Sequence, residues 1–317
     1  MAEKNSPHYI ELEITTEFLS KLIGIPVLEY TEIPVGWNNK AIKVITKDEE
    51  YLLRLSKTTW PKEKITNEVA VLQYLQSINV KCPRIYSYGF DKVHWILMEL
   101  VEGKMLESEW RNLNNNLKLE LIKQIGDQLL ILQQKEYPSI SGWGLKDGLP
   151  ILTTYFDGNY EYSSETEYIT KQLESNIKKL DTVIDTAFLK DVVFKVKQIV
   201  DRLEPVPIVL FHGDFAFRNM IISDNQLVSI LDWEWAGTRP IYMDLLEDML
   251  ENENPTDEME NEWIRNEFRN LGFEYPNERE RKLLLDLVDA TSAWRFGNVE
   301  KAKLRVIDLV NKISGFP

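Results

Sequence analysis

The first third of the chain alternates short apolar runs with turn residues, which predicts a small sheet. The predicted strands cover 26–32, 41–46, 51–55, 84–88 and 94–100, and a short helix precedes them at 15–22. Within this region Val69, Leu72 and Leu75 recur at three-residue spacing, which predicts a helix over 63–78. We therefore expect one sheet accompanied by one main helix.

After residue 103 the spacing of the apolar residues becomes helical, as in the stripe formed by Leu121, Ile125 and Leu129. Further helices are predicted over 165–180, 190–203, 245–250, 258–271, 279–296 and 299–313, and strands at 208–211, 220–223 and 227–231. This pattern predicts an N-terminal lobe over 1–99, a connector over 100–103 and a mostly helical C-terminal lobe over 104–317.

Composition and charge exclude several classes of protein. The 317 residues carry a net charge of −14, which argues against a nucleic-acid partner, because duplex binding depends on Lys and Arg. A single cysteine, Cys82, excludes an intrachain disulfide. No apolar stretch reaches the roughly 18 residues of a membrane span, and the first residues lack a signal-peptide pattern. We expect a cytoplasmic protein without membrane or nucleic-acid partners.

Part of the negative charge is concentrated in one run, residues 244–262, which holds nine carboxylates and no Lys or Arg. Such a run is typical of a solvated helical face. It could equally form a negative rim that attracts cationic ligands. Asp244 and Glu247, at the start of the run, have the spacing of a capping box at a helix start.

The candidate chemistry lies in the second group of predicted strands. Asp214 and Asn219 follow one strand, five residues apart, and Asp232 follows the hairpin that comes next. Side chains on adjacent strand ends can converge. A carboxylate and an amide together suit Mg²⁺, while another carboxylate can accept a proton from a hydroxyl group. Phosphoryl transfer uses this division of roles.

The segments His212–Asp214 and Asp232–Glu234 resemble the catalytic and metal loops of kinases, in the form found in the aminoglycoside phosphotransferase and choline kinase-like family. The resemblance covers nearly the whole chain. It implies an α+β, bilobal protein-kinase-like fold, with a small antiparallel-sheet N-terminal lobe and a larger, mostly helical C-terminal lobe. It also implies that Asp214 is the catalytic base and that Asn219 and Asp232 hold Mg²⁺.

The resemblance extends to the N-terminal lobe. Period-2 alternation puts Leu52 and Arg54 on one strand face, where Leu52 would contact the adenine and Arg54 the phosphates. Arg54 stands where kinases carry a lysine, and Glu68 matches its helix partner. The candidate nucleotide-binding residues are Arg54, Glu68, Gly36, Asn39, Leu52, Glu99 and Val101, with Gly36 and Asn39 in the phosphate-covering loop and the main chain of Glu99 and Val101 at the purine edge.

The leading hypothesis is a phosphotransferase with an alcohol group as acceptor, a kinase that transfers the γ-phosphate of ATP or GTP to a small cationic molecule. An aminoglycoside is the first choice, because acid-lined sites suit polyamines; choline, sugars and macrolides stay open. The role would be antibiotic resistance or metabolism. The candidate acceptor-binding residues are Asp248, Glu251, Glu262, Asp157, Tyr160 and Trp294. We expect a monomer or homodimer.

An alternative hypothesis is a catalytically inactive kinase-fold scaffold that binds nucleotide or partner proteins. Arg54 and the covering loop, which has Gly36 as its one glycine, motivate this alternative. A protein kinase is disfavoured because the chain after Asp232 leaves little room for an activation segment. His212 is expected to shape the catalytic loop rather than to carry protons.

Overall fold

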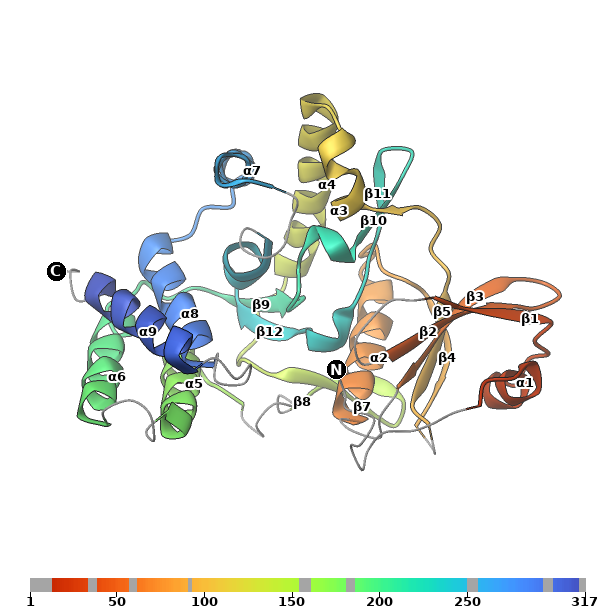
Figure 1. Cartoon of the computed structure of the whole chain (residues 1–317), viewed down its shortest axis with the longest axis horizontal. Coiled ribbons are helices and arrows are strands. Elements are labelled where there is room, and N and C mark those ends of the chain that lie inside the picture. Colours follow the sequence, from red (N-terminus) through yellow and green to blue (C-terminus); the bar gives the residue numbers. More distant parts are fainter. Residues whose placement is uncertain are drawn as a thin grey trace.

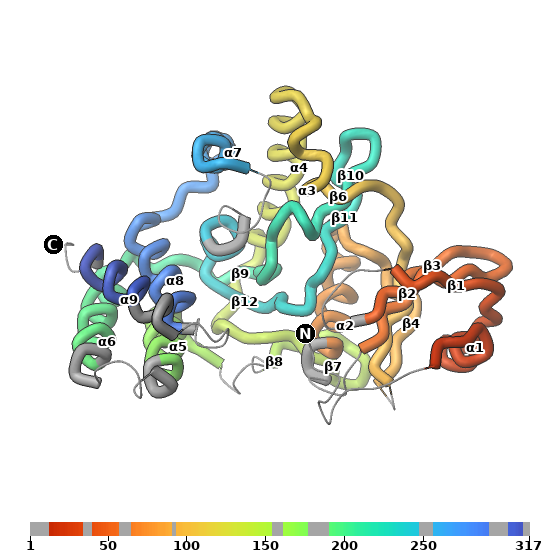
Figure 2. Tube along the Cα trace, in the orientation of Figure 1, coloured from red at the N-terminus to blue at the C-terminus, as the bar shows by residue number. Residues whose placement is uncertain are grey.

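The computed structural model describes residues 13–33, 39–56, 62–90, 93–153, 161–180, 186–249, 256–292 and 299–313. An N-terminal sheet lies at one end of the molecule and a group of helices at the other, with α4 and short strands between them (Figure 1). The trace in Figure 2 shows that this helical end combines segments from the middle and from the last part of the chain.

The N-terminal sheet consists of antiparallel strands in the spatial order β1, β2, β3, β5, β4. Their bounds are Glu29–Ile33, Asn39–Ile45, Glu50–Ser56, Ile85–Gly89 (β4) and Trp95–Glu99 (β5). These are the five strands that the sequence predicts. The small antiparallel N-terminal sheet is thereby confirmed.

The two faces of β3 have different neighbours. Leu53 and Leu55 are buried in a cluster with Leu19 of α1 (Thr16–Ile23). Leu52 and Arg54, on the opposite face, border a cavity. The alternation predicted for this strand is therefore confirmed, and it directs a guanidinium group away from the apolar cluster.

The C-terminal part is built around α4 (Asn115–Gln133), whose Leu121, Ile125 and Leu129 are buried as their spacing predicts. Two small sheets accompany it, in the orders β11-β10-β6 and β8-β7-β12-β9. The strands are β6 Lys104–Met105, β7 Gly142–Lys146, β8 Leu149–Thr153, β9 Ile208–Phe211, β10 Met220–Ser223, β11 Gln226–Ile230 and β12 Gly237–Pro240. Short helical turns, α3 (Leu106–Glu109) among them, connect these elements.

A second hydrophobic cluster holds four helices together at the far end: α5 (Glu165–Leu180), α6 (Thr186–Val200), α8 (Glu278–Ser292) and α9 (Val299–Ile313). In contrast, α7 (Glu258–Asn270) packs Ile264 and Phe268 onto the α4 cluster. The bounds of α5 and α9 match the prediction. No helix among the described residues is both long and apolar enough to cross a membrane.

Several elements differ from the prediction. The sequence of β12, Gly-Thr-Arg-Pro, contains residue types that strands disfavour, and this strand forms by pairing with β9. The hairpin β7–β8 was not predicted either. The segment η4 (Asp244–Met249) is a π-helix, where the sequence predicts an α-helix.

Helix α2 (Lys62–Ser77) contacts both parts of the molecule. Val69 packs beside β5, while Leu72 and Leu75 belong to the large cluster around α4. Buried Asn67 adds a polar link, because its Nδ2 donates to the carbonyls of Glu234 (3.2 Å) and Ala236 (2.9 Å) and its Oδ1 accepts the Trp143 N–H (2.7 Å). The helix is thus tied to the segment that follows Asp232.

Candidate active site

Strand β9 ends at Phe211 and leads into the loop that carries the predicted base. The carboxylate of Asp244 accepts the backbone N–H of His212 at 2.9 and 3.0 Å and that of Gly213 at 3.2 Å. Asp244 is 5% exposed. The residue that the sequence assigns to a helix start therefore also anchors this loop.

His212 joins the two loops of the site. Its Nδ1 accepts the N–H of Asp214 at 3.0 Å, so Nε2 carries the proton and donates to the Leu231 carbonyl at 2.8 Å. The ring is fully buried, and burial lowers its pKa. A neutral imidazole held by two hydrogen bonds suits the predicted role of His212, which is to shape this loop.

Gly213 occupies a position where a side chain would not fit. Its φ of +88° is left-handed, and a Cβ atom there would lie 2.7 Å from the carbonyl oxygen of Trp235. Since Trp235 directly follows Asp232–Glu234, this glycine allows the segment His212–Asp214 to approach the segment Asp232–Glu234 closely.

Asp214 and Asn219 contact each other directly. Nδ2 of Asn219 donates to Oδ2 and to the backbone carbonyl of Asp214, both at 2.8 Å. Arg218 forms an ion pair with the other carboxylate oxygen of Asp214. No described residue donates to Oδ1 of Asn219, which leaves this amide oxygen available to a cation.

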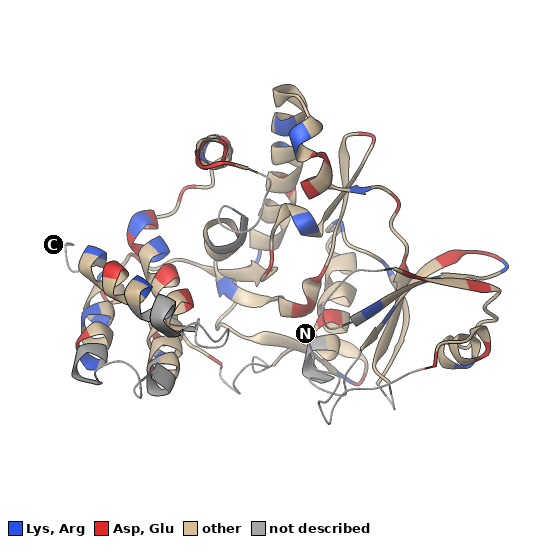
Figure 3. Ribbon diagram, in the orientation of Figure 1, with Lys and Arg blue, Asp and Glu red and all other residues tan. Residues whose placement is uncertain are grey.

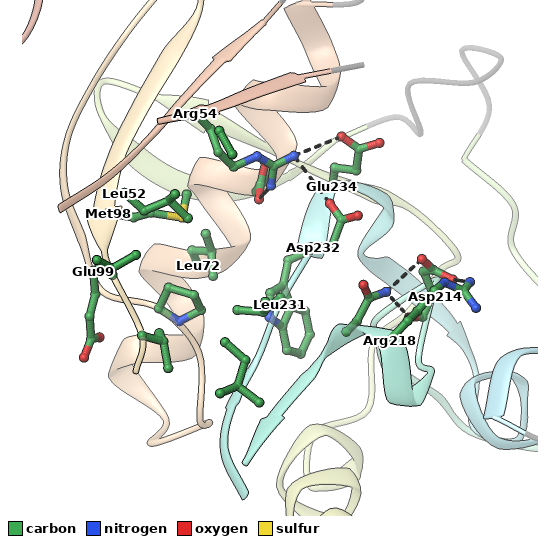
Figure 4. A pocket seen from close by; sticks show the side chains of 18 of the residues that line it. Leu52, Arg54, Leu72, Met98, Glu99, Asp214, Arg218, Leu231, Asp232 and Glu234 are labelled. Atoms are coloured by element: carbon green, nitrogen blue, oxygen red, sulfur yellow. Dashed lines mark hydrogen bonds and ion pairs between the residues drawn. The ribbon is translucent and has the colours of Figure 1, made fainter. Parts of the chain in front are cut away.

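Asp232 lies near Asp214 and Asn219 because β10 and β11 form a hairpin. The N–H of Leu231 donates to the carbonyl of Asn219 at 2.7 Å, so Asp232 emerges beside Asn219. Asp232 has a left-handed conformation (φ +62°), which is strained for a residue with a side chain. Its side chain is 40% exposed and lies between Arg54 and Asp214 (Figure 4).

Arg54 forms the predicted ion pair with buried Glu68. Its Nη2 also lies 3.4 Å from Asp232 and 3.5 Å from Glu234. Burial alone would lower the pKa of the guanidinium, but these carboxylates outweigh it and raise the pKa above its ordinary value. The nearby lysines of β2, Lys40 and Lys43, pair with Glu32 and Glu50 of the N-terminal sheet.

These groups border one cavity of about 720 Å³ between the N-terminal sheet and the hairpin β10–β11. Its apolar end includes Leu52, Met98, Leu72 and Leu231, and its polar end holds the charged groups (Figure 4). Of the predicted nucleotide-binding residues, those that line it are Leu52, Arg54, Glu68, Glu99 and Val101. A slot with one apolar and one charged end matches the two ends of a nucleotide.

The side chains of two predicted nucleotide-binding residues are not described. Gly36 lies outside the described residues, and Asn39 begins β2 without a described side chain. Sequence reasoning missed Glu234 and Arg218, both of which line the cavity. The sequence could have indicated them, because Arg218 directly precedes Asn219 and Glu234 lies two residues after Asp232.

Of the predicted acceptor-binding residues, Glu262 is the one whose side chain the structure describes. Asp157, Tyr160, Glu251 and Trp294 lie outside the described residues, and Asp248 lies in η4 without a described side chain. Glu262 lies on α7, 53% exposed at its side chain, and pairs with Arg265 (3.2 Å) and Arg269 (3.5 Å). It does not line the cavity, and its predicted part in binding a cationic acceptor stays a prediction.

The two arginines beside Glu262 border a second cavity of about 520 Å³, whose charged lining is mostly basic: Arg265, Arg269, Glu278, Arg279, Lys282 and Lys312. The acidic run is also less uniform than its sequence indicates. Within it, Asp257 caps α7, and Glu260 accepts from Lys118 (2.5 Å) and Trp110 (3.0 Å). Figure 3 shows acidic and basic residues interspersed over the C-terminal helices.

The donor set fits Mg²⁺. No three His, Cys, Asp or Glu side chains of the described ranges cluster as a metal site. A cation here would therefore depend on the amide oxygen of Asn219, a carboxylate oxygen of Asp232 and oxygens of a bound phosphate chain. Hard oxygen ligands shared with phosphate are what Mg²⁺ prefers.

The fold and this arrangement of side chains define a kinase-like phosphotransferase. The model of the phosphotransferase enzyme family (APH) matches residues 29–280. The chain belongs to this family, and the predicted enzyme class, a phosphotransferase that acts on an alcohol group, is confirmed. A search of curated proteins finds no match.

Solved structures support the same fold. A complex of a thermostable aminoglycoside phosphotransferase APH(4)-Ia variant with ADP and hygromycin B is 14% identical, with TM-score 0.64 over 96% of this chain and 99% of that one. The streptomycin–ATP complex of APH(2")-IIa is 14% identical, with TM-score 0.66 over 95% and 97%. A candidate fructosamine-3-kinase from Thermobifida fusca is 15% identical, with TM-score 0.60 over 93% and 99%. The predicted bilobal kinase-like fold is thereby confirmed.

Proposed function

We propose that this protein is a small-molecule kinase that transfers the γ-phosphate of ATP or GTP to a hydroxyl group of its acceptor. The observation that carries the proposal is the meeting of Asp214, Asn219 and Asp232 at the charged end of one cavity that also contains Arg54. Residues 1–99 would form the nucleotide lobe, 100–103 the connector and 104–317 the catalytic lobe.

The nucleotide would enter with its base at the apolar end. Leu52 and Leu231 would enclose the purine, and the main chain of residues 99–101 would bind its edge. The N–H of Glu99 already donates to the carbonyl of Arg84 at 2.8 Å. The Glu99 carbonyl and the Val101 N–H are therefore the groups we assign to the purine.

Asp214 is the proposed base. One of its oxygens would take the proton of the acceptor hydroxyl while that hydroxyl oxygen bonds to the γ-phosphorus and the bond from phosphorus to the nucleoside diphosphate breaks. Asn219 keeps the Asp214 carboxylate in place through its Nδ2. Mg²⁺, held by Asn219 and Asp232, would neutralise phosphate charge. Arg54, oriented by Glu68, would contact the phosphates nearer the nucleoside.

We further propose a cationic acceptor in the cytoplasm. The support is the net charge of −14 and the carboxylates that outnumber guanidinium groups around the cavity. Related folds have been solved with hygromycin B, streptomycin and gentamicin, so aminoglycosides are the first class to test. A resistance role would follow from activity on an aminoglycoside, and amino sugars such as fructosamines are the next class.

The test is release of nucleoside diphosphate from Mg·ATP and Mg·GTP across aminoglycosides, fructosamines, choline, macrolides and sugar alcohols. We expect turnover that depends on one acceptor class and is lost in Asp214→Ala. Nucleotide binding without turnover on any acceptor would contradict the choice of acceptors. Failure to bind nucleotide at millimolar concentration would contradict the kinase proposal itself.

One observation favours a nucleotide-gated scaffold as a second candidate. Arg54 is engaged by the carboxylates of Glu68, Asp232 and Glu234, so incoming phosphates must compete for it. A scaffold would bind nucleotide with equal affinity in the wild type and in Asp214→Ala, and neither protein would turn over. Acceptor-dependent turnover in the wild type alone excludes it.

A further inference from the structure

Arg218 lies beside the proposed base, in a turn that the kinase assignment leaves unexplained. The turn η2 (Phe217–Asn219) brings its guanidinium back to Asp214, four residues earlier, where Nη2 pairs with Oδ1. Both side chains line the main cavity. In Figure 4 the guanidinium meets Asp214 on the side away from Arg54.

The guanidinium of Arg218 has an unused donor. Its Nη1 is buried and has no hydrogen-bond partner within the described part of the chain. A guanidinium presents five N–H donors in a rigid fork, and a buried charged donor without an acceptor is unfavourable. The side chain is 29% exposed and lines the cavity, so a rotation of the guanidinium would turn this unpaired arm toward an anion that arrives with the substrates.

The charges around the cavity also favour an anion at Arg218. Among the described residues that line the cavity, five carboxylates (Glu68, Glu99, Asp214, Asp232 and Glu234) face two guanidinium groups, Arg54 and Arg218. A triphosphate entering this cavity needs cations. Arg54 is in contact with three carboxylates, whereas Arg218 pairs with one. Arg218 is therefore the protein cation with the more available charge.

We propose that Arg218 is a second catalytic residue, which binds the transferred phosphoryl group through Nη1 while Nη2 positions Asp214. This inference rests on the proposed kinase function. A base within about 2.6–3.2 Å of the acceptor hydroxyl is one atom away from the phosphorus that this hydroxyl attacks. The guanidinium that touches the base can therefore reach the equatorial oxygens, where charge collects in the transition state.

The test compares Arg218→Ala, Arg218→Gln and Arg218→Lys with the matched control Arg305→Ala. Arg305 lies on α9 and pairs with exposed Asp289 at 2.9 Å, far along the chain from the cavity. We expect kcat to fall about 100-fold in Arg218→Ala, with the KM for nucleotide nearly unchanged. Gln keeps a donor for Asp214 but not the charge, so it should resemble Ala, whereas Lys should recover part of the rate.

A second readout needs no acceptor. Binding of ADP with Mg²⁺ and aluminium fluoride imitates the transferred phosphoryl group, and Arg218→Ala should lose about 100-fold in affinity for this complex relative to ADP alone. Wild-type rates in Arg218→Gln would contradict the contact between Arg218 and the phosphoryl group. Arg218 would then only position Asp214. Unchanged rates in Arg218→Ala would overturn the inference alone, whereas a wild type that binds no nucleotide would overturn the proposed function with it. Thermal unfolding of each variant identifies any that misfolds.

Discussion

The strands around the loop His212–Asn219 and the surfaces of helices α8 and α9 use polar groups in different ways. Around the loop, buried groups bond between distant parts of the chain, as Asp244 does with His212 and Asn67 with Ala236. On α8 and α9, apart from the buried pair of Arg281 with Glu165, ion pairs such as Lys282 with Asp286 and Lys312 with Asp308 join residues four apart on one helix. Pairs of this second kind contribute little, so substitutions in them should cost much less than substitutions around the loop.

The largest effect is expected for Asp232→Asn. Loss of this carboxylate removes a charged ligand from the proposed Mg²⁺ site, so the maximal rate should fall about 1000-fold and the Mg²⁺ concentration for half-maximal rate should rise. Initial rates across a magnesium titration measure both quantities. A rate within tenfold of the wild type at the same half-saturating Mg²⁺ would contradict the assignment.

The next largest effect is expected for Arg54→Met, on the free energy of unfolding. It removes the guanidinium from the carboxylate of Glu68, whose side chain is 2% exposed, which costs about 3 kcal/mol of unfolding free energy. Urea unfolding of this variant is compared with Arg305→Met, whose arginine is 46% exposed at its side chain. Equal losses in the two variants would show that the network around Arg54 is no different from a surface pair.

Gly213→Ala tests the close approach of the two loops. Gly148→Ala is the matched control, since Gly148 also has a left-handed φ (+77°) but nothing within 4 Å of a Cβ atom. The control should lose about 1 kcal/mol, and Gly213→Ala about 2 kcal/mol more because of the contact with Trp235. Equal unfolding free energies for the two variants would argue against this packing.

The pH dependence of stability should report His212. Burial holds the pKa of its imidazole below the ordinary value, so the unfolded chain binds a proton more readily. The stability due to neutral His212 is present above about pH 6.5 and is lost as the pH falls. His212→Gln should flatten the slope between about pH 7.5 and pH 5.5 by at most about 1.4 kcal/mol per pH unit. Parallel curves would mean that His212 does not titrate there.

The smallest effect is expected for Glu262→Gln on α7. Its pairs with Arg265 and Arg269 are exposed, so stability should change by less than about 1 kcal/mol and the acceptor KM by less than about twofold. This variant is also the carboxylate-to-amide control for Asp232→Asn. A large rise in acceptor KM would instead place Glu262 at the acceptor site.

The elements that sequence reasoning predicted well are those whose pattern is local. Strand β9 and helices α5 and α9 have their predicted bounds because their apolar periodicity is strong. The strand β12 could not be predicted, since Thr238 and Arg239 are buried through distant contacts: pairing with β9, hydrogen bonds with Ser139 and Ser141, and packing of Arg239 on Tyr168 and Phe211. The polar groups of β12 find their hydrogen-bond partners far away in the sequence.

The same distinction applies to the site. Asp214, Asn219 and Asp232 could be predicted to lie together because their spacing follows neighbouring strand ends, and the pairing of Arg54 with Glu68 because each is placed by one strand or helix. An acceptor site depends on how helices pack, which no spacing encodes. Glu262 illustrates this: its acidity suggested a cationic ligand, whereas folding sets it against two arginines.

The central claim is that Asp214 directs phosphoryl transfer to a hydroxyl group. The most direct measurement is transfer of labelled phosphate from γ-³²P-ATP to the acceptor that stimulates turnover, by the wild type and by Asp214→Asn. The account predicts a labelled, acid-stable phosphate ester from the wild type and at least about a 100-fold slower reaction in the variant, with nucleotide affinity retained. An acid-labile phosphoramidate, or equal label transfer by Asp214→Asn, would contradict it.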